Sequence, residues 1–386
     1  MKPLRELDGY ASYDPYDLWA TPAGVGIRKR FYEGDFTGKA GAVIFSLLDW
    51  ALPSLSRLLI GASPILHPIT AAHLILTSRY TVGTPQKGSL DILKRLASGR
   101  KSSQDEWAWG LGFPWMSKNG LYDREVPFVT HTPYVMEALL FIAGEKELKE
   151  DAMAMFNGTW PFLESLHVKE SGAGRLALSY APVDEPRIVV NANAYASFAY
   201  ALHARYGRAE VRDAARAKSI ELANWVIGEQ DERGAWFYYA DKEPGNFIDC
   251  FHSCFVIKNL KKAGGLIGDI KAEASIEKGF GFLKESFYDP KQGLCRRFLV
   301  RDIKDPYRCD LYDQAEFLGL LIDMGEIEEA GIFHDRVKGV FNSGDDWWCK
   351  IDLLGRRWGK NLLRWGIAPF WYNSARLGSA ISQREV

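Results

Sequence analysis

The feature that most constrains the fold of this chain is a repeated unit, in which a short aromatic turn leads into a helix start that carries polar side chains. The polar groups at these helix starts are Thr130 and His131, Asn191 and Asn193, Asp249 and His252, Asp310 and Asp313, and Arg364. The helix starts recur at roughly 55 to 60 residues, and a fixed period of that length indicates a chain built from repeated supersecondary units. Each unit would bring an aromatic rim and a few polar groups to the same end of the molecule.

Between these turns the sequence shows helical periodicity, with apolar residues at positions i, i+3 and i+4. The periodic segments are 133–143, 148–166, 192–206, 211–228, 250–263, 272–286, 314–324 and 362–377. Glycines that we expect to end helices lie between them, at Gly144, Gly207, Gly264, Gly265, Gly325 and Gly378. An early pair is expected at 66–77 and 82–97. The pattern therefore predicts helices in pairs, joined by short turns.

Within a pair, the first helix is nearly free of charge and the second is amphipathic. Segment 192–202 has no charged residue, whereas 210–221 is rich in Arg, Lys and Glu. Since an all-apolar helix is buried on every side and an amphipathic helix faces solvent on one side, an inner and an outer ring result. We therefore predict an all-α fold, an (α/α)6-like toroid of helical hairpins. Residues 1–386 would form one domain, with 1–40 as an N-terminal capping segment and short β-prone pieces at 234–240 and 295–301 in the cleft-side loops.

The composition limits the partners and the compartment. Charged residues make up 25% of the chain and nearly cancel, to a net charge of -1, so nothing favours nucleic acid. The five cysteines show no CxxC pair and are expected to be free structural thiols, as in a reducing compartment. The charged N-terminus lacks an apolar run of signal-peptide length, which predicts a cytoplasmic protein.

One apolar stretch, 42–62, has about the length of a membrane span. Asp49, Pro53 and Arg57 interrupt it and would be costly at bilayer depth, so we interpret it as a buried helix pair. Peripheral contact with an inner membrane stays open at this point.

Three motifs carry a resemblance to known proteins: Trp109-Gly-Leu-Gly-Phe-Pro-Trp115, Asp249-Cys-Phe-His252 and Arg364-Trp-Gly-Ile-Ala-Pro-Phe-Trp-Tyr372. They resemble the six-hairpin (α/α) toroid proteins encoded among bacterial surface-polysaccharide biosynthesis genes and, more distantly, the C-terminal toroid of D-glucuronyl C5-epimerases. The resemblance implies a carbohydrate-active setting and leaves the reaction open. The counterparts of an epimerase-type tyrosine site would be Tyr238, Tyr239, Tyr312 and Tyr372.

The candidate catalytic residues fit two chemistries. Proton abstraction next to a uronate carboxylate needs a base and an acid, for which the candidates are His131, His252, Tyr238 and Tyr239. It also needs a group such as Asn191 or Arg364 that neutralises the carboxylate. Glycoside hydrolysis needs two carboxylates that flank the bond, which Asp313 with Glu316, or Asp345 with Asp346, could supply. Asp249 also has the sequence context of an N-cap. On that basis we expect His252→Ala to abolish turnover and Asp249→Asn to preserve it.

Aromatic residues complete the predicted site. Flat aromatic faces can stack on pyranose rings, and we assign substrate binding to residues at the helix-start end of the repeats. These are Trp115, Trp236, Tyr312 and Trp347, together with Asn191 and Arg364. Phosphate loops, metal-spaced His/Glu pairs and Rossmann glycines are missing from the sequence, so we expect neither a cofactor nor a metal.

The leading hypothesis is a carbohydrate-active enzyme of surface-polysaccharide metabolism. It would use acid/base chemistry in a central cleft, as an epimerase or lyase or as a glycoside hydrolase, on an oligosaccharide or polysaccharide; whether the substrate is lipid-linked stays open. The alternatives are a terpenoid-binding or terpenoid-cyclising toroid, since aromatic rings stabilise carbocations, and a saccharide-binding protein without catalysis.

Overall fold

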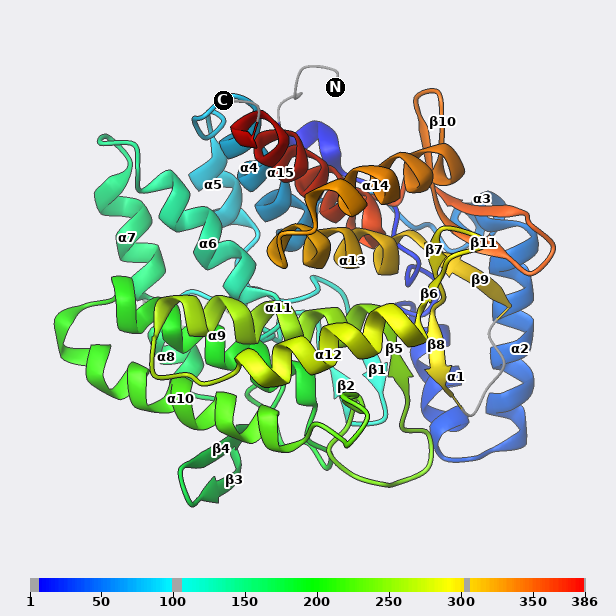
Figure 1. Cartoon of the computed structure of the whole chain (residues 1–386). Helices are drawn as coiled ribbons and strands as arrows, with labels where there is room; N and C mark the ends of the chain where they lie inside the picture. Colours follow the sequence, from blue (N-terminus) through cyan, green and yellow to red (C-terminus); the bar gives the residue numbers. More distant parts are fainter. Residues whose placement is uncertain (1–6, 99–105, 302–305, 385–386) are drawn as a thin grey trace.

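The computed structural model describes residues 7–98, 106–301 and 306–384. Six of the described helices pack into a closed ring, in which each helix contacts the next and the last contacts the first (Figure 1). In ring order these inner helices are α4 (Pro68–Thr81), α6 (Thr132–Ile142), α9 (Val190–Tyr206), α11 (Cys250–Leu266), α13 (Leu311–Asp323) and α15 (Ala368–Arg384). The predicted (α/α)6 toroid is confirmed.

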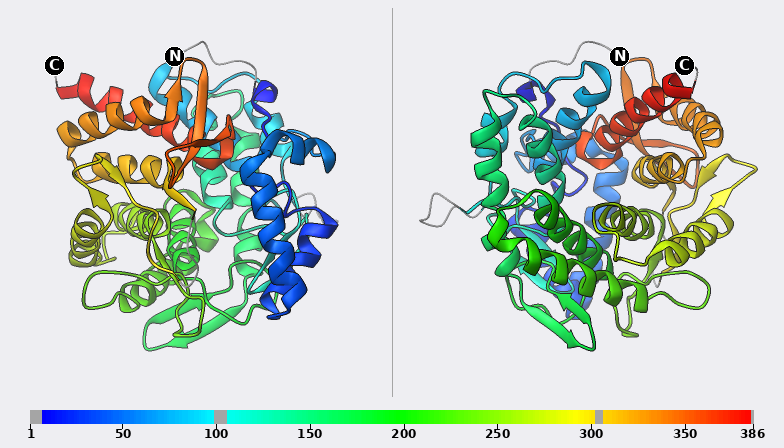
Figure 2. Two further views of the ribbon diagram at one scale, coloured as in Figure 1. Left: turned by 90° about the vertical axis from the view of Figure 1, so that its right-hand side faces the viewer. Right: turned by 60° about the vertical axis from the view of Figure 1, so that its left-hand side comes forward.

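A second layer of helices packs on the outside of the ring (Figure 2). The outer helices that follow the inner ones are α5 (Ser89–Arg95), α7 (Lys149–Asn157), α8 (Trp160–Glu164), α10 (Arg212–Gly228), α12 (Glu273–Ser286) and α14 (Ile327–Phe341). The 3-10 turn η2 (Ala209–Val211) precedes α10. The N-terminal region supplies η1 (Leu7–Tyr10), α1 (Pro22–Tyr32), α2 (Phe36–Ala51) and α3 (Pro53–Leu59). The first six residues of the predicted capping segment lie outside the described residues, and position 40 falls inside α2.

Short antiparallel strands connect the hairpins. Two-stranded pairs are β1 (Trp115–Ser117) with β2 (Gly120–Tyr122), β3 (Val168–Gly172) with β4 (Arg175–Leu178), β5 (Ile248–Asp249) with β8 (Phe298–Val300), and β6 (Tyr288–Asp289) with β7 (Leu294–Cys295). In a four-stranded sheet, β11 (Asp346–Asp352) pairs with β9 (Tyr307–Asp310), β10 (Asn342–Ser343) and β12 (Arg357–Lys360). The strand predicted at 234–240 is wrong: only Tyr239 forms a bridge there, to Val189.

The division into inner and outer helices follows the charge pattern. In α9 every residue from Val190 to His203 is buried, whereas α10 buries only the face that includes Leu222 and Trp225. All five cysteines are free and buried, as predicted.

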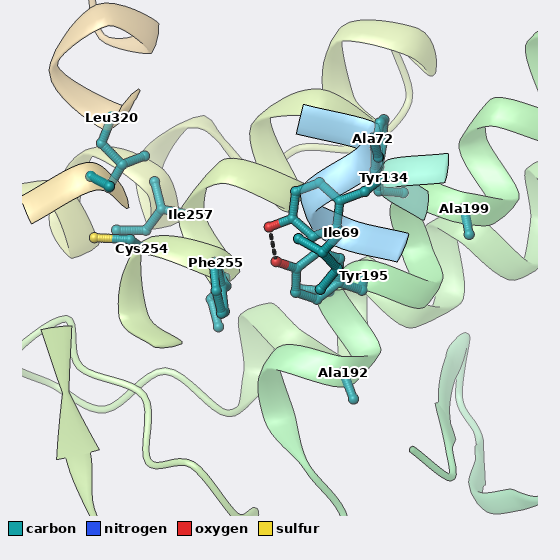
Figure 3. Close-up of a cluster of buried hydrophobic side chains, with 14 of the residues drawn as sticks. Ile69, Ala72, Tyr134, Ala192, Tyr195, Ala199, Cys254, Phe255, Ile257 and Leu320 are labelled. Carbon is teal, nitrogen blue, oxygen red and sulfur yellow. Dashed lines mark hydrogen bonds between the residues drawn. The ribbon is translucent and has the colours of Figure 1, made fainter. Parts of the chain in front are cut away.

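The interior of the ring holds one buried polar network. The hydroxyl groups of Tyr134 and Tyr195 face each other at 2.6 Å in the hydrophobic core (Figure 3). The ammonium group of Lys258 donates to the Tyr134 hydroxyl at 2.9 Å and to the Glu316 carboxylate at 2.6 Å. The proposed use of Glu316 as a catalytic carboxylate is therefore wrong, because a buried ion pair already occupies it.

Several inner helices begin with local signals that the sequence contains. Proline occupies the first turn of α4 and α6, where it lacks the N–H that a helix start would leave unpaired. Before α15 the π-helical turn η3 (Leu363–Ile367) is kinked at Gly366, whose φ is +94°. A Cβ there would lie 2.7 Å from the Tyr312 nitrogen, so only glycine lets η3 pass α13.

The glycines predicted as helix stops give a mixed result. Gly144, Gly207 and Gly325 follow helix ends as expected. In contrast, α11 runs through Gly264 and Gly265 to Leu266, and α15 runs through Gly378, so those stops are wrong. Tertiary packing of the long inner helices outweighs the cost of about 1 kcal/mol per interior glycine.

The burial of the apolar stretch 42–62 differs from the prediction more than that of any other predicted segment. It forms most of α2 and all of α3, and the interpretation as a buried pair is wrong, because Leu47, Leu58 and Leu59 are exposed. None of the described helices is by itself both long and apolar enough to cross a membrane. The helices α2 and α3 pass that test only together, and they are bent by 118° at their junction.

Candidate active site

The polar residues at the starts of the inner helices meet loop residues at one end of the ring. We call this group the polar cluster: Asp14, His67, His131, Asp249, His252, Asp313 and Arg364. Contacts join most of its members into two groups, and the Phe251 and Trp365 rings, whose centroids are 6.0 Å apart, bring these groups next to each other. The Phe251 N–H of α11 donates to Asp313 of α13 at 3.0 Å, and Arg364 holds Asp14, which lies 3.5 Å from His67. The repeat phase read from the sequence thus places these helix starts at a common end.

The most chemically suggestive pair is His252 with Asp249, one helical turn apart at the start of α11. The Nδ1 atom of His252 lies 2.7 and 2.9 Å from the two oxygens of the Asp249 carboxylate. A carboxylate accepts a hydrogen bond from Nδ1–H, so the neutral imidazole carries its lone pair on Nε2. The Asp249 side chain is buried, at 2% exposed, while His252 is 22% exposed and can meet a ligand.

Aromatic rings surround the His252 imidazole. The ring centroids of Phe251, Tyr238 and Phe247 lie 4.0, 4.6 and 5.8 Å from that of His252. Burial raises the pKa of Tyr238 well above its usual value, so its hydroxyl stays protonated. The tyrosine beside the histidine is thus Tyr238.

The capping interpretation of Asp249 is wrong. Asp249 has the N-cap position of α11, but its side chain makes no cap hydrogen bond. The amide of Phe251, which such a cap could serve, is instead bound by Asp313 from the neighbouring inner helix. Because another residue satisfies this amide, the Asp249 carboxylate is free to orient His252, and the expectation that Asp249→Asn preserves activity no longer follows.

The two aspartates of α13 have different roles. Asp310 is the cap: it accepts from the Tyr312 N–H at 2.9 Å and from the Trp365 indole N–H at 2.9 Å. Asp313 is buried; its Oδ2 atom lies 3.9 Å from Nε of Arg297 and has no hydrogen-bond partner among the described residues. Burial raises the pKa of Asp313 well above its usual value, and the negative charge of Asp310 adds to the effect. A protonated Asp313 can donate a proton but is a poor nucleophile.

Arg364 is neutralised within the protein. Its Nε and NH2 groups hold the fully buried Asp14 in a two-point ion pair, with NH2 at 2.7 Å from Oδ1. Burial would raise the pKa of Asp14, but the Arg364 charge offsets this and holds the pKa below its usual value. The guanidinium proposed to bind a substrate carboxylate is therefore largely engaged.

His131 forms a second directed imidazole. The Thr130 hydroxyl donates to the Tyr180 hydroxyl at 2.8 Å and lies 3.2 Å from Nδ1 of His131. Because the single Thr130 hydroxyl proton is donated to Tyr180, the Thr130 oxygen can only accept a hydrogen bond from Nδ1–H of His131. Burial lowers the pKa of His131 well below its usual value, with Arg364 adding to the effect, so the ring is neutral. Its Nε2 atom is buried and, in the part of the chain that the structure describes, has no hydrogen-bond partner.

Three predicted site residues do not join the polar cluster. Trp236 is core: it is 3% exposed and its indole N–H donates to the Val226 carbonyl at 2.8 Å. The ring of Tyr239 lies under the Arg187 guanidinium at 3.7 Å. Trp347 packs against Phe370, which stacks on His334 of outer helix α14. The position of an aromatic residue in the sequence repeat does not distinguish a side chain at the helix-start end of the ring from one packed between two outer helices.

Of the remaining predicted residues, Tyr312 and Trp115 pack against rings beside the cluster. Asn191 is buried, and its Oδ1 has no hydrogen-bond partner within the described part of the chain. The Tyr312 ring is 6% exposed and lies 5.2 Å from the Trp365 ring. Trp115 is half-buried, 4.3 Å from the Tyr16 ring and 3.9 Å under the Arg28 guanidinium. Asp346, the other acidic candidate, pairs with Lys360 at 2.8 Å on a hairpin, and Asp345 beside it is exposed.

Sequence reasoning missed Asp14, Tyr16 and His67. A signal existed for His67, because His67-Pro68 precedes α4 much as His131-Thr-Pro133 opens α6. Nothing in the sequence marks Asp14, which lies 350 residues from its partner Arg364. Among the described residues, no group of three or more His, Cys, Asp or Glu side chains is arranged to hold a metal ion.

Two cavities lie apart from the polar cluster. One, of about 260 Å³, is lined by residues that include Arg308 and Arg336, and the other, of about 220 Å³, by residues that include Trp160 and His203. At the cluster itself, Tyr16, Tyr180 and Tyr238 are half-buried.

No protein-family model matches this chain, and no curated protein matches it by sequence. Solved structures with the same toroid do. A sugar epimerase from a ruminal bacterium is similar over 84% of this chain and 90% of its own, with a TM-score of 0.58 and 13% identity. The cellobiose 2-epimerase of Bacillus thermoamylovorans has a TM-score of 0.57 and 11% identity, over 82% and 88%. The GH76 α-mannanase BT2949 of Bacteroides thetaiotaomicron has 0.55 and 12%, over 84% and 89%. At these identities the likeness shows a shared fold.

Proposed function

We propose that this chain is a carbohydrate-active enzyme that removes and returns a proton at a sugar carbon, with His252 as a base and Asp249 as the group that orients it. The observation that carries the proposal is the two-oxygen contact of Asp249 with Nδ1 of His252. It fixes the tautomer with a free Nε2 and stabilises the imidazolium that forms when Nε2 takes a proton.

A second base supports epimerisation. At the start of α6, the buried Nε2 of His131 has no hydrogen-bond partner among the described residues, and α9 lies between α6 and α11 in the ring. We propose that the two imidazoles act on one substrate from different inner helices. In one direction the neutral His131 would remove a proton from a carbon next to a carbonyl or carboxyl group, and His252, entering as the imidazolium that Asp249 stabilises, would return a proton to the opposite face. In the reverse direction His252 would be the base, so the two rings exchange protonation states in each turnover. Tyr180, which accepts from Thr130, keeps its own proton to donate to a substrate oxygen.

The carboxylates argue against hydrolysis as the leading reaction. A glycosidase needs one acid and one free base or nucleophile on either side of the bond. In the described part of the cluster, Asp14 is held by Arg364, Asp310 caps α13 and Asp249 orients His252. Asp313 is left, and it already accepts from the Phe251 N–H at 3.0 Å and faces the Arg297 guanidinium at 3.9 Å.

A role in surface-polysaccharide metabolism is part of the proposal and rests on the sequence motifs. The solved structures that share the fold include a sugar epimerase, a D-mannose isomerase and an α-mannanase. They support a sugar as the substrate class. A cytoplasmic setting is part of the proposal and is supported by the five free, buried cysteines, which suit a reducing compartment.

The test is incubation in deuterium oxide with a panel of aldoses, ketoses, reducing disaccharides and uronate-containing oligosaccharides, followed by NMR. Deuterium at a carbon-bound position of one sugar, lost in His252→Gln by about 10² to 10⁴-fold, is the expected result. His334→Gln is the matched control, because His334 also contacts a carboxylate, Asp335 at 3.0 Å, but lies on α14 away from the cluster. New reducing ends without deuterium would instead assign hydrolysis, and no change in any sugar would leave a binding protein.

A further inference from the structure

The exposed side of α2 and α3 carries a patch that the proposed function does not use. We call it the leucine face: Val43, Ile44, Leu47, Leu48, Leu52, Leu55, Leu58, Leu59, Leu353 and Leu354, all exposed. Leu58 and Leu59 are 75% and 74% exposed, and Leu354 is 85% exposed. In Figures 1 and 2 the blue helices α1 to α3 stand along one edge of the molecule. Contiguous apolar surface of this kind marks an interaction site.

The charges that interrupt the apolar stretch point into the protein. Arg57 donates to Asp49 at 2.8 Å and to Asp17 at 3.1 Å, and both Asp49 and Arg57 are buried. The outer side of the stretch 42–62 therefore carries no exposed charge. The sequence argument against bilayer contact, that Asp49 and Arg57 would be costly there, does not apply to this side.

The β11–β12 turn extends the leucine face. Trp50 of α2 donates to Asp352 at 3.0 Å, and the Trp358 indole donates to the Asp49 carbonyl at 2.8 Å, so the turn with Leu353 and Leu354 is fastened beside the end of α2. Elements that are 300 residues apart thus present apolar side chains side by side.

Cations border this apolar surface. Arg356, in the same turn, is exposed and reaches the Ala51 carbonyl at 3.2 Å, and the Arg308 guanidinium lies beside Gly355 of the turn. Lys39 is exposed on α2. Apolar side chains bordered by basic residues match the acyl and headgroup layers of a bilayer that contains anionic lipid.

From this arrangement we propose that the leucine face docks the protein on the surface of an anionic phospholipid membrane. The 118° bend between α2 and α3 rules out a straight span and lets both helices lie in the interface. The α3 residue Arg57 also bonds the Asp14 carbonyl, and α1 carries Arg28 over Trp115, so docking would place the polar cluster beside the membrane. This inference does not depend on the proposed reaction.

The test is co-sedimentation of the full chain with vesicles of phosphatidylcholine alone and with about one third phosphatidylglycerol. The parent should bind the anionic vesicles, and the double variant Leu58→Glu, Leu59→Glu should lose about ten-fold or more of that binding. Arg356→Ala should weaken only the part that depends on phosphatidylglycerol. Ile332→Glu, a 69% exposed position on α14, is the control and should bind like the parent.

Light scattering and thermal melts complete the design. All substituted side chains are exposed, so the melting temperature should stay unchanged. Absence of vesicle binding by the parent overturns the proposal. So does a dimer that the double variant dissociates while neither protein binds vesicles, because the leucine face would then be covered by a second copy.

Discussion

The substitution Asp249→Asn is the experiment for which the sequence and the structure lead to opposite expectations. The substitution keeps the size of the side chain and, at a helix N-cap, is nearly neutral. In the structure, however, both Asp249 oxygens contact Nδ1 of His252, so the substitution removes a negative charge and lets an amide nitrogen face the ring. An amide that donates to Nδ1 would place the proton on Nε2 and block the base.

The magnitude follows from the geometry. The nitrogen–oxygen contacts of 2.7 and 2.9 Å put the charge centres of the imidazolium and the carboxylate about 4 Å apart. At an effective dielectric constant of about 20 their attraction is about 4 kcal/mol, which corresponds to a factor of about 10³ in rate. Because His252 is 22% exposed and water screens part of this, we expect turnover to fall by about 10² to 10³-fold.

The assay is the rate of deuterium incorporation into the sugar found in the screen, measured beside a thermal melt. Asp249→Asn should melt within a few degrees of the parent, because Asp313, and not Asp249, binds the Phe251 amide. A variant that turns over at the parental rate would refute the role of Asp249. A variant that loses its fold would return Asp249 to a structural role.

Four further predictions test the burial and contacts of single side chains. Trp236→Ala should cost about 3 to 5 kcal/mol of unfolding free energy in denaturant titrations, because Trp236 is core. Trp115→Ala should cost less stability and weaken sugar binding by about 1 kcal/mol in calorimetry; equal stability losses would contradict the assignment. Lys258→Met should destabilise by about 3 to 5 kcal/mol, since it leaves the Glu316 carboxylate buried and unpaired, and adding Glu316→Leu should restore most of the loss. If the double variant is less stable than Lys258→Met, the pair is not coupled as proposed. Burial lowers the pKa of His203 to about 4, so the unfolded chain takes up a proton below about pH 6.5 that the fold does not. Stability contributed above pH 6.5 is thus lost as the pH falls toward 4, and His203→Gln should flatten this fall in pH-dependent unfolding; an unchanged slope would show that His203 does not contribute.

Local patterns were enough to locate most of the inner and outer helices and their phase, but not α1, the start of α2 or the division of 148–166 into α7 and α8. Charge-free and charged helices alternate along the chain, so the inner ring could be assigned, and proline at the first turns of α4 and α6 fixes where they begin. The pairing of Asp249 with His252 was visible as an i, i+3 spacing. What spacing could not supply was the identity of the group that caps α11.

The amino-acid sequence by itself determined the ring, because helical periodicity, buried alternation and repeat length are properties of neighbouring residues. Only the tertiary structure decided which side chains are free to act. Asp313, and not Asp249, accepts the hydrogen bond from the Phe251 N–H at the start of α11, and Asp14 forms an ion pair with Arg364. Asp49 and Arg57 form a buried ion pair, so leucines, and not these two charges, are exposed on that side of α2 and α3. The physical reason is that each of these outcomes depends on which side chains the fold brings within hydrogen-bond distance of a polar group. Such partners lie 8 to 350 residues apart in the chain, so local sequence patterns do not identify them.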